Sequence, residues 1–264
     1  MPALGPRHHR VRRLRALIRD PHARRDAREF VVEGPRIVEA ALDRGAVLES
    51  AYVAPGADRA FRPLTSRLRE LGIPIDELKE GVLERIGDTV TPQPVLAVAS
   101  MTVSELQALD REGLVLVAVS VRDPGNAGTL LRSAEAAGCA GVVFCGNSVD
   151  PYAPKVVRSS AGAVFGIPVV EADDPVKVLD ALGRQGRRRL GAVATEGESF
   201  DRVDLGGPVA VVLGNETEGL PAELDASVDG RVTIPIEPPA DSLNVGMAGT
   251  VLAFEAARQR RAAT

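Results

Sequence analysis

Short apolar runs alternate with helical patterns through the second half of the chain, and this alternation restricts the possible folds more than any other feature of the sequence. The apolar runs span residues 114–120, 141–144, 169–170, 190–194, 209–213 and 231–234. The helical patterns span residues 126–137, 154–159, 175–185 and 245–261. Because parallel strands are joined by crossover helices, this order predicts an α/β domain with a mostly parallel sheet.

A smaller α/β unit is predicted between residues 30 and 100. Helical patterns in it span 35–44, 61–71 and 77–86, and strand patterns span 48–53, 73–75 and 95–99. Pro92 and Pro94 lie near its end, and residues 101–113 read as a short connecting helix. We therefore expect three parts, which are an N-terminal arm (1–29), a small domain (30–105) and a larger domain (106–264).

The N-terminal arm is strongly basic, whereas the rest of the chain is acidic. The first 28 residues carry a net charge of +7, with nine arginines, and the other 236 residues carry −11. A single apolar stripe at helical spacing consists of Val11, Leu14, Leu17 and Ile18. A basic segment on an acidic body is typical of proteins that bind phosphate backbones, although a solvated helix face is the alternative. The arginines that we expect to contact RNA are Arg10, Arg12 and Arg13.

Composition and motifs disfavour several other classes of protein. No apolar run approaches the ~20 residues of a membrane-spanning helix, and the arginine-rich start lacks the apolar region of a secretory signal, so we expect a cytoplasmic protein without membrane contact. The three histidines all lie within the first 22 residues, and Cys139 and Cys145 read as small buried apolar residues, so we expect no metal. The chain has neither a GxGxxG motif nor a phosphate-binding loop, which disfavours nucleotide-binding enzymes.

Two turns that directly follow apolar runs are the candidate site. The run 209–213 leads into a turn with two glycines and Glu216, and the run 231–234 leads through a proline-rich loop into the helix 245–261. Parallel sheets bind ligands at the carboxyl ends of their strands, where both turns are expected to lie. Ser242 is placed as the N-cap of the last helix. Gly246 and Gly249 would each cost that helix up to ~1 kcal/mol relative to Ala, so we expect a close backbone approach to a ligand or a partner subunit.

Three segments of the chain resemble the motifs of the SpoU, or TrmH-like, branch of the SPOUT methyltransferases, which transfer a methyl group from S-adenosylmethionine to a ribose 2′-OH in RNA. The first motif matches at Asn126, Gly128 and Arg132, the second at Gly214, Asn215, Glu216 and Gly219, and the third at Ile234, Pro235, Ser242, Leu243 and Asn244. The resemblance covers the chain from about residue 115 to its C-terminus. It implies a deep trefoil knot in the larger domain, a homodimer, and a small N-terminal domain that is ribosomal-protein L30e-like and binds RNA.

The resemblance also implies roles for individual residues. The catalytic group would be Arg132, supported by Asn126, Glu216, Ser242 and Asn244. The cofactor would contact Leu213, Gly214, Ile234 and Leu243, and Ala194 and Thr195 would close the pocket. Further RNA contacts would come from Lys155, Arg158 and Ser160. The catalytic and RNA-contact residues also have ordinary readings. These are a surface ion pair for Arg132, helix capping for Asn126, Asn244 and Ser242, and an ordinary polar or charged surface position for Glu216, Lys155, Arg158 and Ser160.

These expectations together predict an S-adenosylmethionine-dependent RNA 2′-O-ribose methyltransferase that needs no metal. Large-subunit (23S) ribosomal RNA is the favoured substrate, and an antibiotic-resistance role of the thiostrepton type stays open. One alternative is a tRNA 2′-O-methyltransferase, and another is a catalytically inactive RNA-binding or ribosome assembly factor. The presence of Arg132, Glu216, Ser242 and Asn244 favours an enzyme over an inactive factor.

Overall fold

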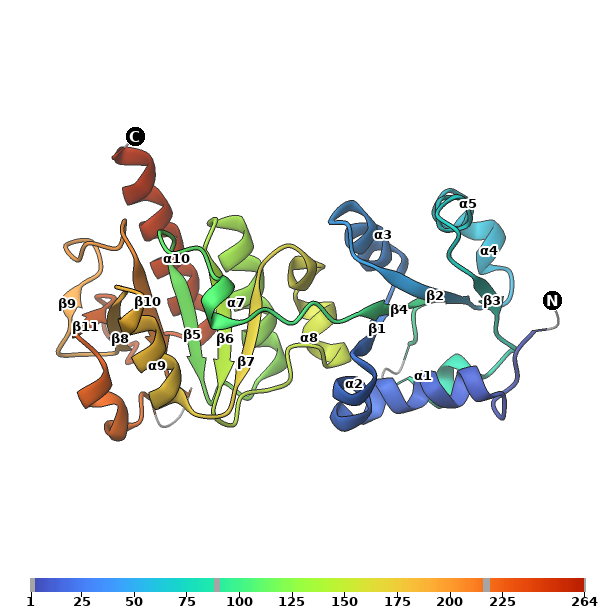
Figure 1. Cartoon of the computed structure of the whole chain (residues 1–264), viewed down its shortest axis with the longest axis horizontal. Helices are drawn as coiled ribbons and strands as arrows, with labels where there is room; N and C mark the ends of the chain where they lie inside the picture. The colour runs from blue at the N-terminus through green and yellow to red at the C-terminus, as the bar shows by residue number, and fades with distance from the viewer. Residues whose placement is uncertain (1–2, 88–90, 216–218, 264) are drawn as a thin grey trace. The chain divides into compact units, whose positions relative to one another are not determined.

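The computed structural model describes residues 3–87, 91–215 and 219–263, which Figure 1 shows as a cartoon. The chain divides into two compact units. The N-terminal unit comprises Met1–Met101 and Tyr152–Phe165, and the C-terminal unit comprises Thr102–Pro151 and Gly166–Thr264. The single boundary near residue 105 therefore stays a prediction. Among the described helices, none is both long and apolar enough to cross a bilayer.

The C-terminal unit is built on a parallel sheet. Its strands are, in spatial order, β7 (Val169–Ala172), β6 (Gly141–Cys145), β5 (Val115–Val119), β10 (Val209–Leu213), β8 (Arg188–Val193), β11 (Gly230–Thr233) and β9 (Glu198–Ser199). Each neighbouring pair in this order is parallel. The predicted mostly parallel α/β sheet is thus confirmed, and the trefoil knot stays a prediction.

Helices cover both faces of this sheet (Figure 1). The helix α9 (Pro175–Arg184) packs its buried residues Val178, Leu179 and Leu182 against Ala210 and Val212 of β10. The helices α7 (Pro124–Ala136) and α10 (Val245–Ala262) pack on each other and cover the opposite face. The predicted connecting helix at 101–113 is wrong, because only the short 3₁₀ turn η1 (Leu106–Ala108) forms there. Another short 3₁₀ helix, η3 (Ala222–Ser227), precedes β11.

Side-chain caps define where the helices of this unit begin. Asp123 caps α7, since its Oδ1 accepts from the backbone N–H of Asn126 at 2.8 Å. Asn126 therefore lies inside the first turn and is not the cap. Asn244 caps α10, because its Oδ1 accepts from the backbone N–H groups of Gly246 (2.9 Å) and Met247 (3.3 Å). The prediction of Ser242 as this cap is wrong by two residues, since the helix begins only at Val245.

The two glycines of α10 allow its close approach to α7. A Cβ atom on Gly249 would lie 2.3 Å from Cδ2 of Leu130, and one on Gly246 would lie 3.1 Å from Cβ of Thr129. Leu130 is completely buried, so its side chain has little freedom to move aside. The glycines of α10 therefore do allow a close backbone approach, as we expected. In this unit the neighbour is the helix α7.

The N-terminal unit has a four-stranded mixed sheet. Its strands are, in spatial order, β1 (Glu29–Glu33), β4 (Val95–Ser100), β2 (Leu48–Val53) and β3 (Ile75–Glu77). Its helices are α1 (His9–Arg19), α2 (Pro21–Ala27), α3 (Pro35–Asp43), α4 (Ala57–Ala60), α5 (Arg62–Glu70), α6 (Leu83–Ile86) and α8 (Pro154–Ser159). The predicted stripe of α1 is confirmed, because Val11, Leu14, Leu17 and Ile18 are buried with Val31 and Val98 of the sheet. Residues 9–27 of the basic arm thus fold into α1 and α2, and both helices pack on β1 of this unit.

Two features of this unit differ from the sequence prediction. We expected a helix over 77–86, whereas only Leu83–Ile86 is helical, because Glu77 belongs to β3 and Gly81 has a φ of +75°. We expected α8 in the second domain, whereas it packs on β1. Aromatic contacts hold this segment there, since the ring centroid of Phe30 lies 5.0 Å from that of Tyr152 and 5.5 Å from that of Phe165.

Candidate active site

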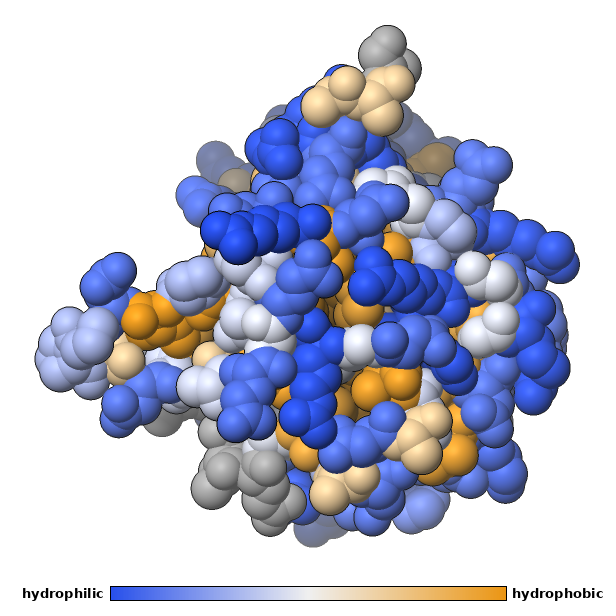
Figure 2. Space-filling model, turned by 90° about the vertical axis from the view of Figure 1, so that its left-hand side faces the viewer, coloured by the Kyte–Doolittle hydropathy of each residue, from blue (hydrophilic) through white to orange (hydrophobic). Residues whose placement is uncertain are grey.

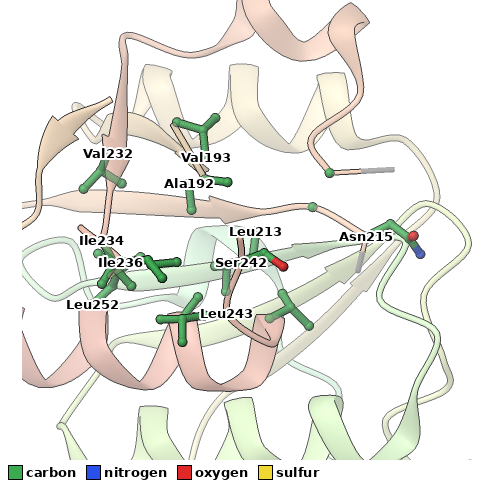
Figure 3. A pocket seen from close by; sticks show the side chains of 15 residues that line it. Ala192, Val193, Leu213, Asn215, Val232, Ile234, Ile236, Ser242, Leu243 and Leu252 are labelled. Atoms are coloured by element: carbon green, nitrogen blue, oxygen red, sulfur yellow. The ribbon is translucent and has the colours of Figure 1, made fainter. Parts of the chain in front are cut away.

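A cavity of about 150 Å³ opens at the carboxyl ends of β10, β8 and β11, against the first turns of α10 (Figure 3). These strands are neighbours in the sheet, so their carboxyl ends lie side by side. The lining comprises Ala192, Val193, Ala194, Leu213, Gly214, Asn215, Gly219, Val232, Ile234, Ile236, Ser242, Leu243, Val245, Ala248 and Leu252. The cavity lies where parallel α/β sheets bind ligands.

The lining is mostly apolar. Among the described residues that form it, none carries a charge, and the polar side chains are Asn215 and Ser242. Backbone amides and carbonyls at the ends of three strands supply the remaining polar groups. Such a site suits a ligand with a flat apolar surface and polar edges, and it offers no cation to a polyphosphate.

Most of the predicted cofactor residues meet in this cavity. Leu213, Gly214, Ile234, Leu243 and Ala194 all line it, whereas Thr195 does not. Ser242, predicted as a catalytic residue, lines it as well. Sequence reasoning missed Val245, Ala248 and Leu252, whose spacing of three and seven residues places them on one face of α10.

The turn after β10 requires glycine at residue 214. A Cβ atom there would lie 2.2 Å from the carbonyl carbon and oxygen of Gly219, and backbone atoms cannot move aside as a side chain can. Asn215 and Gly219 close the turn through two backbone hydrogen bonds, of 3.0 Å and 2.9 Å. Gly219 itself has a φ of +70°, which favours glycine. Glu216, a predicted catalytic residue, lies outside the described residues.

Side chains also tie the ends of β10, β5 and β6 together. The Asn215 amide donates to the carbonyl of Ser120 at 2.9 Å, and Ser120 has a φ of +54° directly after β5. The Ser148 hydroxyl accepts from the backbone N–H of Val121 at 3.1 Å and donates to the carbonyl of Cys145 at 2.8 Å. These bonds fix the chain just before Asp123, and so they fix the start of α7.

Arg132 lies on the exposed side of α7 and does not line the cavity. Among the described residues, Arg132 makes no ion pair, so the reading as a surface salt bridge has no support in that part of the chain. Thr129, one turn earlier on the same face, packs against Gly246 in the first turn of α10. The helix face that carries Arg132 is therefore next to the turn that lines the cavity. Asn126 is buried, and Asn244 is exposed and caps α10.

The predicted RNA contacts differ in how freely they can reach a ligand. Lys155 and Arg12 are exposed. Arg158 forms an ion pair with the buried Glu33, with Nη1 2.6 Å from Oε2. Ser160 is fully buried, and its hydroxyl donates to the carbonyl of Val157 at 2.8 Å, so the structure does not present it to an outside ligand.

Two arginines of α1 also have acidic partners. Arg10 Nη1 lies 2.5 Å from Oδ2 of the buried Asp76, and this hydrogen bond raises the pKa of Arg10. Arg13 pairs with Glu29. Both guanidinium groups remain half exposed, so each can turn further donors toward solvent.

Comparison with known proteins agrees with this architecture. Residues 113–254 match the SpoU rRNA Methylase family, and residues 8–97 match the MRM3-like substrate binding domain. The chain is 32% identical over 225 residues to the 23S rRNA (guanosine(2553)-2′-O)-methyltransferase RlmP of Bacillus subtilis, and the match covers 85% of this chain and 87% of that protein. It is 31% identical to a 23S rRNA (uridine(2479)-2′-O)-methyltransferase of Streptomyces viridochromogenes, and that match covers 96% of this chain and 91% of that enzyme.

A solved structure extends the comparison to three dimensions. The SpoU methyltransferase AviRb from Streptomyces viridochromogenes, in complex with the cofactor AdoMet, superimposes with a TM-score of 0.84 at 29% sequence identity. The superposition covers 97% of this chain and 100% of that chain, so both units have counterparts. The chain therefore belongs to the SpoU rRNA methylase family.

Proposed function

We propose that this protein is an S-adenosylmethionine-dependent RNA 2′-O-ribose methyltransferase that acts on large-subunit ribosomal RNA. The observation that carries the proposal is the cavity at the carboxyl ends of β8, β10 and β11, where residues from the second and third sequence motifs meet. Membership of the family supports the reaction. The names of the two similar enzymes, both 23S rRNA 2′-O-methyltransferases, support the choice of substrate. A location in the cytoplasm is part of the same proposal.

The lining of the cavity fits S-adenosylmethionine, which supplies a methyl group activated by its positively charged sulfur. Leu213, Ile234 and Leu243 offer apolar surface to a flat ring. Gly214 brings backbone groups close, and Ser242 adds a hydroxyl at the edge. Thr195 follows Ala194 in the chain and does not line the cavity, and its role in closing the pocket stays a prediction.

Arg132 is the proposed catalytic residue. A ribose hydroxyl is a weak nucleophile, so the site has to stabilise the negative charge that develops on its oxygen. A guanidinium group holds its proton firmly and is rarely a base, so we assign Arg132 the role of holding that oxygen and the adjacent phosphate while the proton leaves to phosphate or water. Its exposure on α7 leaves the guanidinium accessible to RNA.

The other predicted catalytic residues act in this proposal by positioning. Asn126 sits buried in the first turn of α7, and Asn244 fixes the first turn of α10. Among those that the structure describes, Ser242 also touches the cavity. Glu216 would orient Arg132 or Asn126 as a carboxylate, and this assignment rests on the sequence motif alone.

The N-terminal unit would bind RNA through its exposed cations, with Arg12 and Lys155 foremost. Arg10 and Arg13 would add donors from guanidinium groups that stay half exposed. Arg158, which is paired with Glu33, is the remaining candidate. The match of residues 8–97 to the MRM3-like substrate binding domain supports this role.

A homodimer formed through α10 completes the proposal. Met247 and Phe254 are 56% and 45% exposed and stand seven residues apart, hence on one face of the helix. Leu243, just before the helix, is 41% exposed. Exposed apolar side chains in one row are typical of interfaces. Sedimentation of the wild type and of Phe254→Glu tests this, because the variant should shift the protein to monomer.

The experiment that tests the reaction is methyl transfer from labelled S-adenosylmethionine to total RNA, followed by mapping of the labelled nucleotide. Wild type, Arg132→Ala and a control, Arg111→Ala, are compared. Arg111 is an exposed arginine of the same unit outside the motifs. We expect label at one 2′-O position of large-subunit ribosomal RNA. Loss of one charge-stabilising donor costs roughly 100- to 1000-fold, so label should nearly vanish with Arg132→Ala and persist with Arg111→Ala.

Binding of S-adenosylmethionine, measured by calorimetry, separates the possible failures. Arg132 does not line the cavity, so Arg132→Ala should bind the cofactor as the wild type does. Label in transfer RNA would replace the proposed substrate. Cofactor binding without label in any RNA, free or ribosomal, would contradict the proposed activity and favour a binding factor.

A further inference from the structure

A second cavity, of about 570 Å³, lies at the opposite end of β8 from the candidate active site. It is formed where α9 ends and the chain turns into β8. Its charged lining consists of Arg184, Arg187, Arg188, Arg189, Asp180 and Asp229. The cavity therefore has four positive and two negative side chains, and none of them belongs to the motifs of the family.

Two of these arginines are held in place by bonds to the protein. Arg189 forms a two-pronged pair with Asp229, with Nε 2.9 Å from Oδ2 and Nη2 2.6 Å from Oδ1. This hydrogen bonding lowers the pKa of Asp229 and raises that of Arg189. Arg187 is buried, and its Nη atoms donate to the carbonyls of Asp110 and Gly113. Its Nε is buried without a hydrogen-bond partner among the described residues.

The other two arginines are exposed. Neither Arg184 nor Arg188 forms a salt bridge with a described residue. The positive charge of Arg188 helps to lower the pKa of Asp229, but the hydrogen bonds to that carboxylate come from Arg189. Both guanidinium groups thus keep donors for an outside ligand at the rim of a cavity whose base is rigid.

The charge of the surrounding unit makes this cluster unusual. The C-terminal unit carries 13 basic and 22 acidic residues, a net charge of −9, yet four of its basic residues fall within residues 184–189. Figure 2 shows one face of the molecule, on which hydrophilic side chains predominate and apolar patches are scattered. An acidic unit repels RNA, so the places where a phosphate backbone can approach are set by local positive clusters.

We propose that this cavity, named here the arginine cavity, binds phosphates of the RNA substrate. Arg184 and Arg188 would donate hydrogen bonds to the phosphate oxygens. Arginine suits this role because its planar fork matches the geometry of phosphate oxygens. The proposal rests on the proposed function, since it assumes an RNA substrate. It adds a contact surface for that RNA away from the reacting atoms.

The position of the cavity constrains the RNA that uses it. Arg188 begins β8 and Val193, which lines the candidate active site, ends it. The two residues are separated by five steps along the strand, which correspond to about 17 Å at ~3.3 Å each. An RNA that reaches both sites must extend around the unit over at least that distance.

The test compares binding of a ribosomal RNA fragment by the full-length wild type, by Arg184→Gln/Arg188→Gln and by a control with Arg111→Gln/Arg202→Gln. Arg111 and Arg202 are exposed in the same unit but lie outside the arginine cavity, so the control removes the same charge. Affinity is measured over a series of salt concentrations. Each lost phosphate contact reduces the slope of log K against log salt by about 0.7 to 0.9, so we expect the slope to fall by about 1.5 for the cavity variant alone.

Kinetics supply a second readout. Because the cavity is distant from the reacting atoms, KM for RNA should rise several-fold in the cavity variant while kcat at saturating RNA stays as in the wild type. Equal slopes and affinities for all three proteins would overturn the proposal, and so would an equal loss in the control. Failure of the proposed function would appear differently, as a wild type that methylates no RNA.

Discussion

Ser133 donates a hydrogen bond to the hydroxyl of Thr250 where α7 crosses α10, with 2.7 Å between the two oxygens. The direction follows from Thr250, whose own proton is donated to the carbonyl of Gly246, also at 2.7 Å. The chain of bonds thus runs from the helix that carries Arg132 to the first turn of α10. It sets the spacing between the proposed catalytic arginine and a wall of the candidate active site.

The first prediction concerns this hydrogen bond. Ser133→Ala should lower the free energy of unfolding by about 1 kcal/mol, because a partly buried hydroxyl bond is lost. Thr250→Val removes the acceptor at similar shape. Urea unfolding of both single variants and the double variant gives a double-mutant cycle, and we expect a coupling of about 1 kcal/mol. Purely additive effects would show that the hydroxyls do not act together.

The second prediction concerns Gly249. Replacing glycine by alanine inside a helix normally stabilises it by up to ~1 kcal/mol. Here the added Cβ would meet Leu130 at 2.3 Å and Leu213 at 3.0 Å. Overpacking of a filled core costs ~1 to 3 kcal/mol, so Gly249→Ala should lower the free energy of unfolding. In Gly207→Ala, where a Cβ atom meets no other atom within 4 Å, stability should stay the same or rise. A Gly249→Ala protein as stable as this control would contradict the packing argument.

The sequence predicted those helices and strands whose bounds are set by neighbouring residues in the chain. The bounds of β10 and β2 were predicted as the structure has them, because each is a continuous run of strand-forming residues. The start of α8 was predicted correctly because Pro154 occupies its first turn. The helix expected at 77–86 failed because burial of Leu78 under α1 depends on the whole N-terminal unit.

In the candidate site, too, the sequence predicted what depends on local motifs and missed what depends on distant contacts. The sequence motifs identified Leu213, Gly214, Ile234 and Leu243, which all line the cavity. They could not show that Arg158 is paired with Glu33, because that partner lies 125 positions away in sequence. Contacts between segments so far apart leave no periodic signal in a single sequence. The arginine cavity was missed for a related reason, since Asp229 and Arg189 are brought together only by the pairing of β8 and β11.

The third prediction is a pH dependence that arises from Asp229. The hydrogen bond from Arg189 holds the pKa of this carboxylate below its ordinary value, so the unfolded chain takes up a proton at higher pH than the folded chain. The stabilisation is therefore complete above the ordinary aspartate pKa and is lost as the pH falls through the lowered folded value. Urea unfolding at a series of acidic pH values should show a shallower loss of stability for Asp229→Asn than for wild type.

A matched variant separates this effect from general acid unfolding. Asp225 pairs with Arg231 at 2.9 Å on the surface, and the pair is more exposed than that of Arg189 and Asp229. Exposed pairs contribute little, so Asp225→Asn should follow the wild-type pH profile closely. Identical profiles for wild type and Asp229→Asn would rule out the assigned role of the Arg189 pair.

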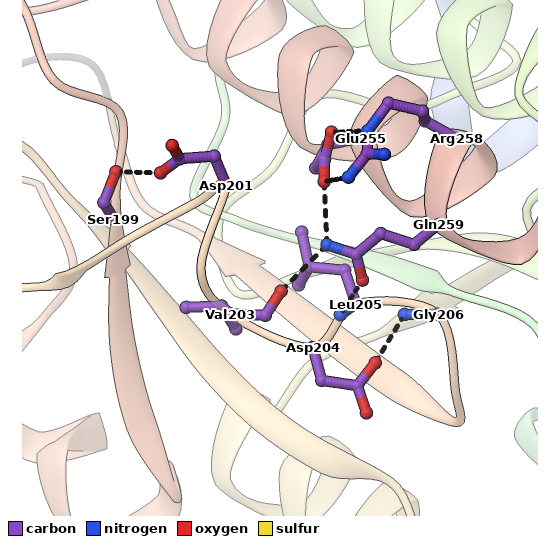
Figure 4. Close-up of polar contacts among 9 residues, drawn as sticks. All are labelled: Ser199, Asp201, Val203, Asp204, Leu205, Gly206, Glu255, Arg258 and Gln259. Atoms are coloured by element: carbon purple, nitrogen blue, oxygen red, sulfur yellow. Dashed lines mark hydrogen bonds and ion pairs between the residues drawn. The ribbon is translucent and has the colours of Figure 1, made fainter. Parts of the chain in front are cut away.

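The fourth prediction concerns Gln259, which ties the segment before β10 to α10 (Figure 4). Its amide nitrogen donates to the carbonyl of Val203 (2.9 Å) and to Oε1 of Glu255 (2.8 Å), and its oxygen accepts from the backbone N–H of Leu205 (2.7 Å). Val203 and Leu205 are buried, so water cannot replace these bonds without rearrangement.

Gln259→Leu should therefore lower the free energy of unfolding by ~1 to 3 kcal/mol, since buried backbone groups lose their partner. The amide of Leu205 should also exchange its hydrogen faster, which mass spectrometry or NMR can measure. Arg258→Ala is the control on the same turn of α10, because the Arg258 guanidinium bonds to Glu255 and, among the described residues, not to the segment 203–205. If exchange at Leu205 were equally slow in both variants, the segment would be held by its apolar contacts and Gln259 would have no share in fixing it.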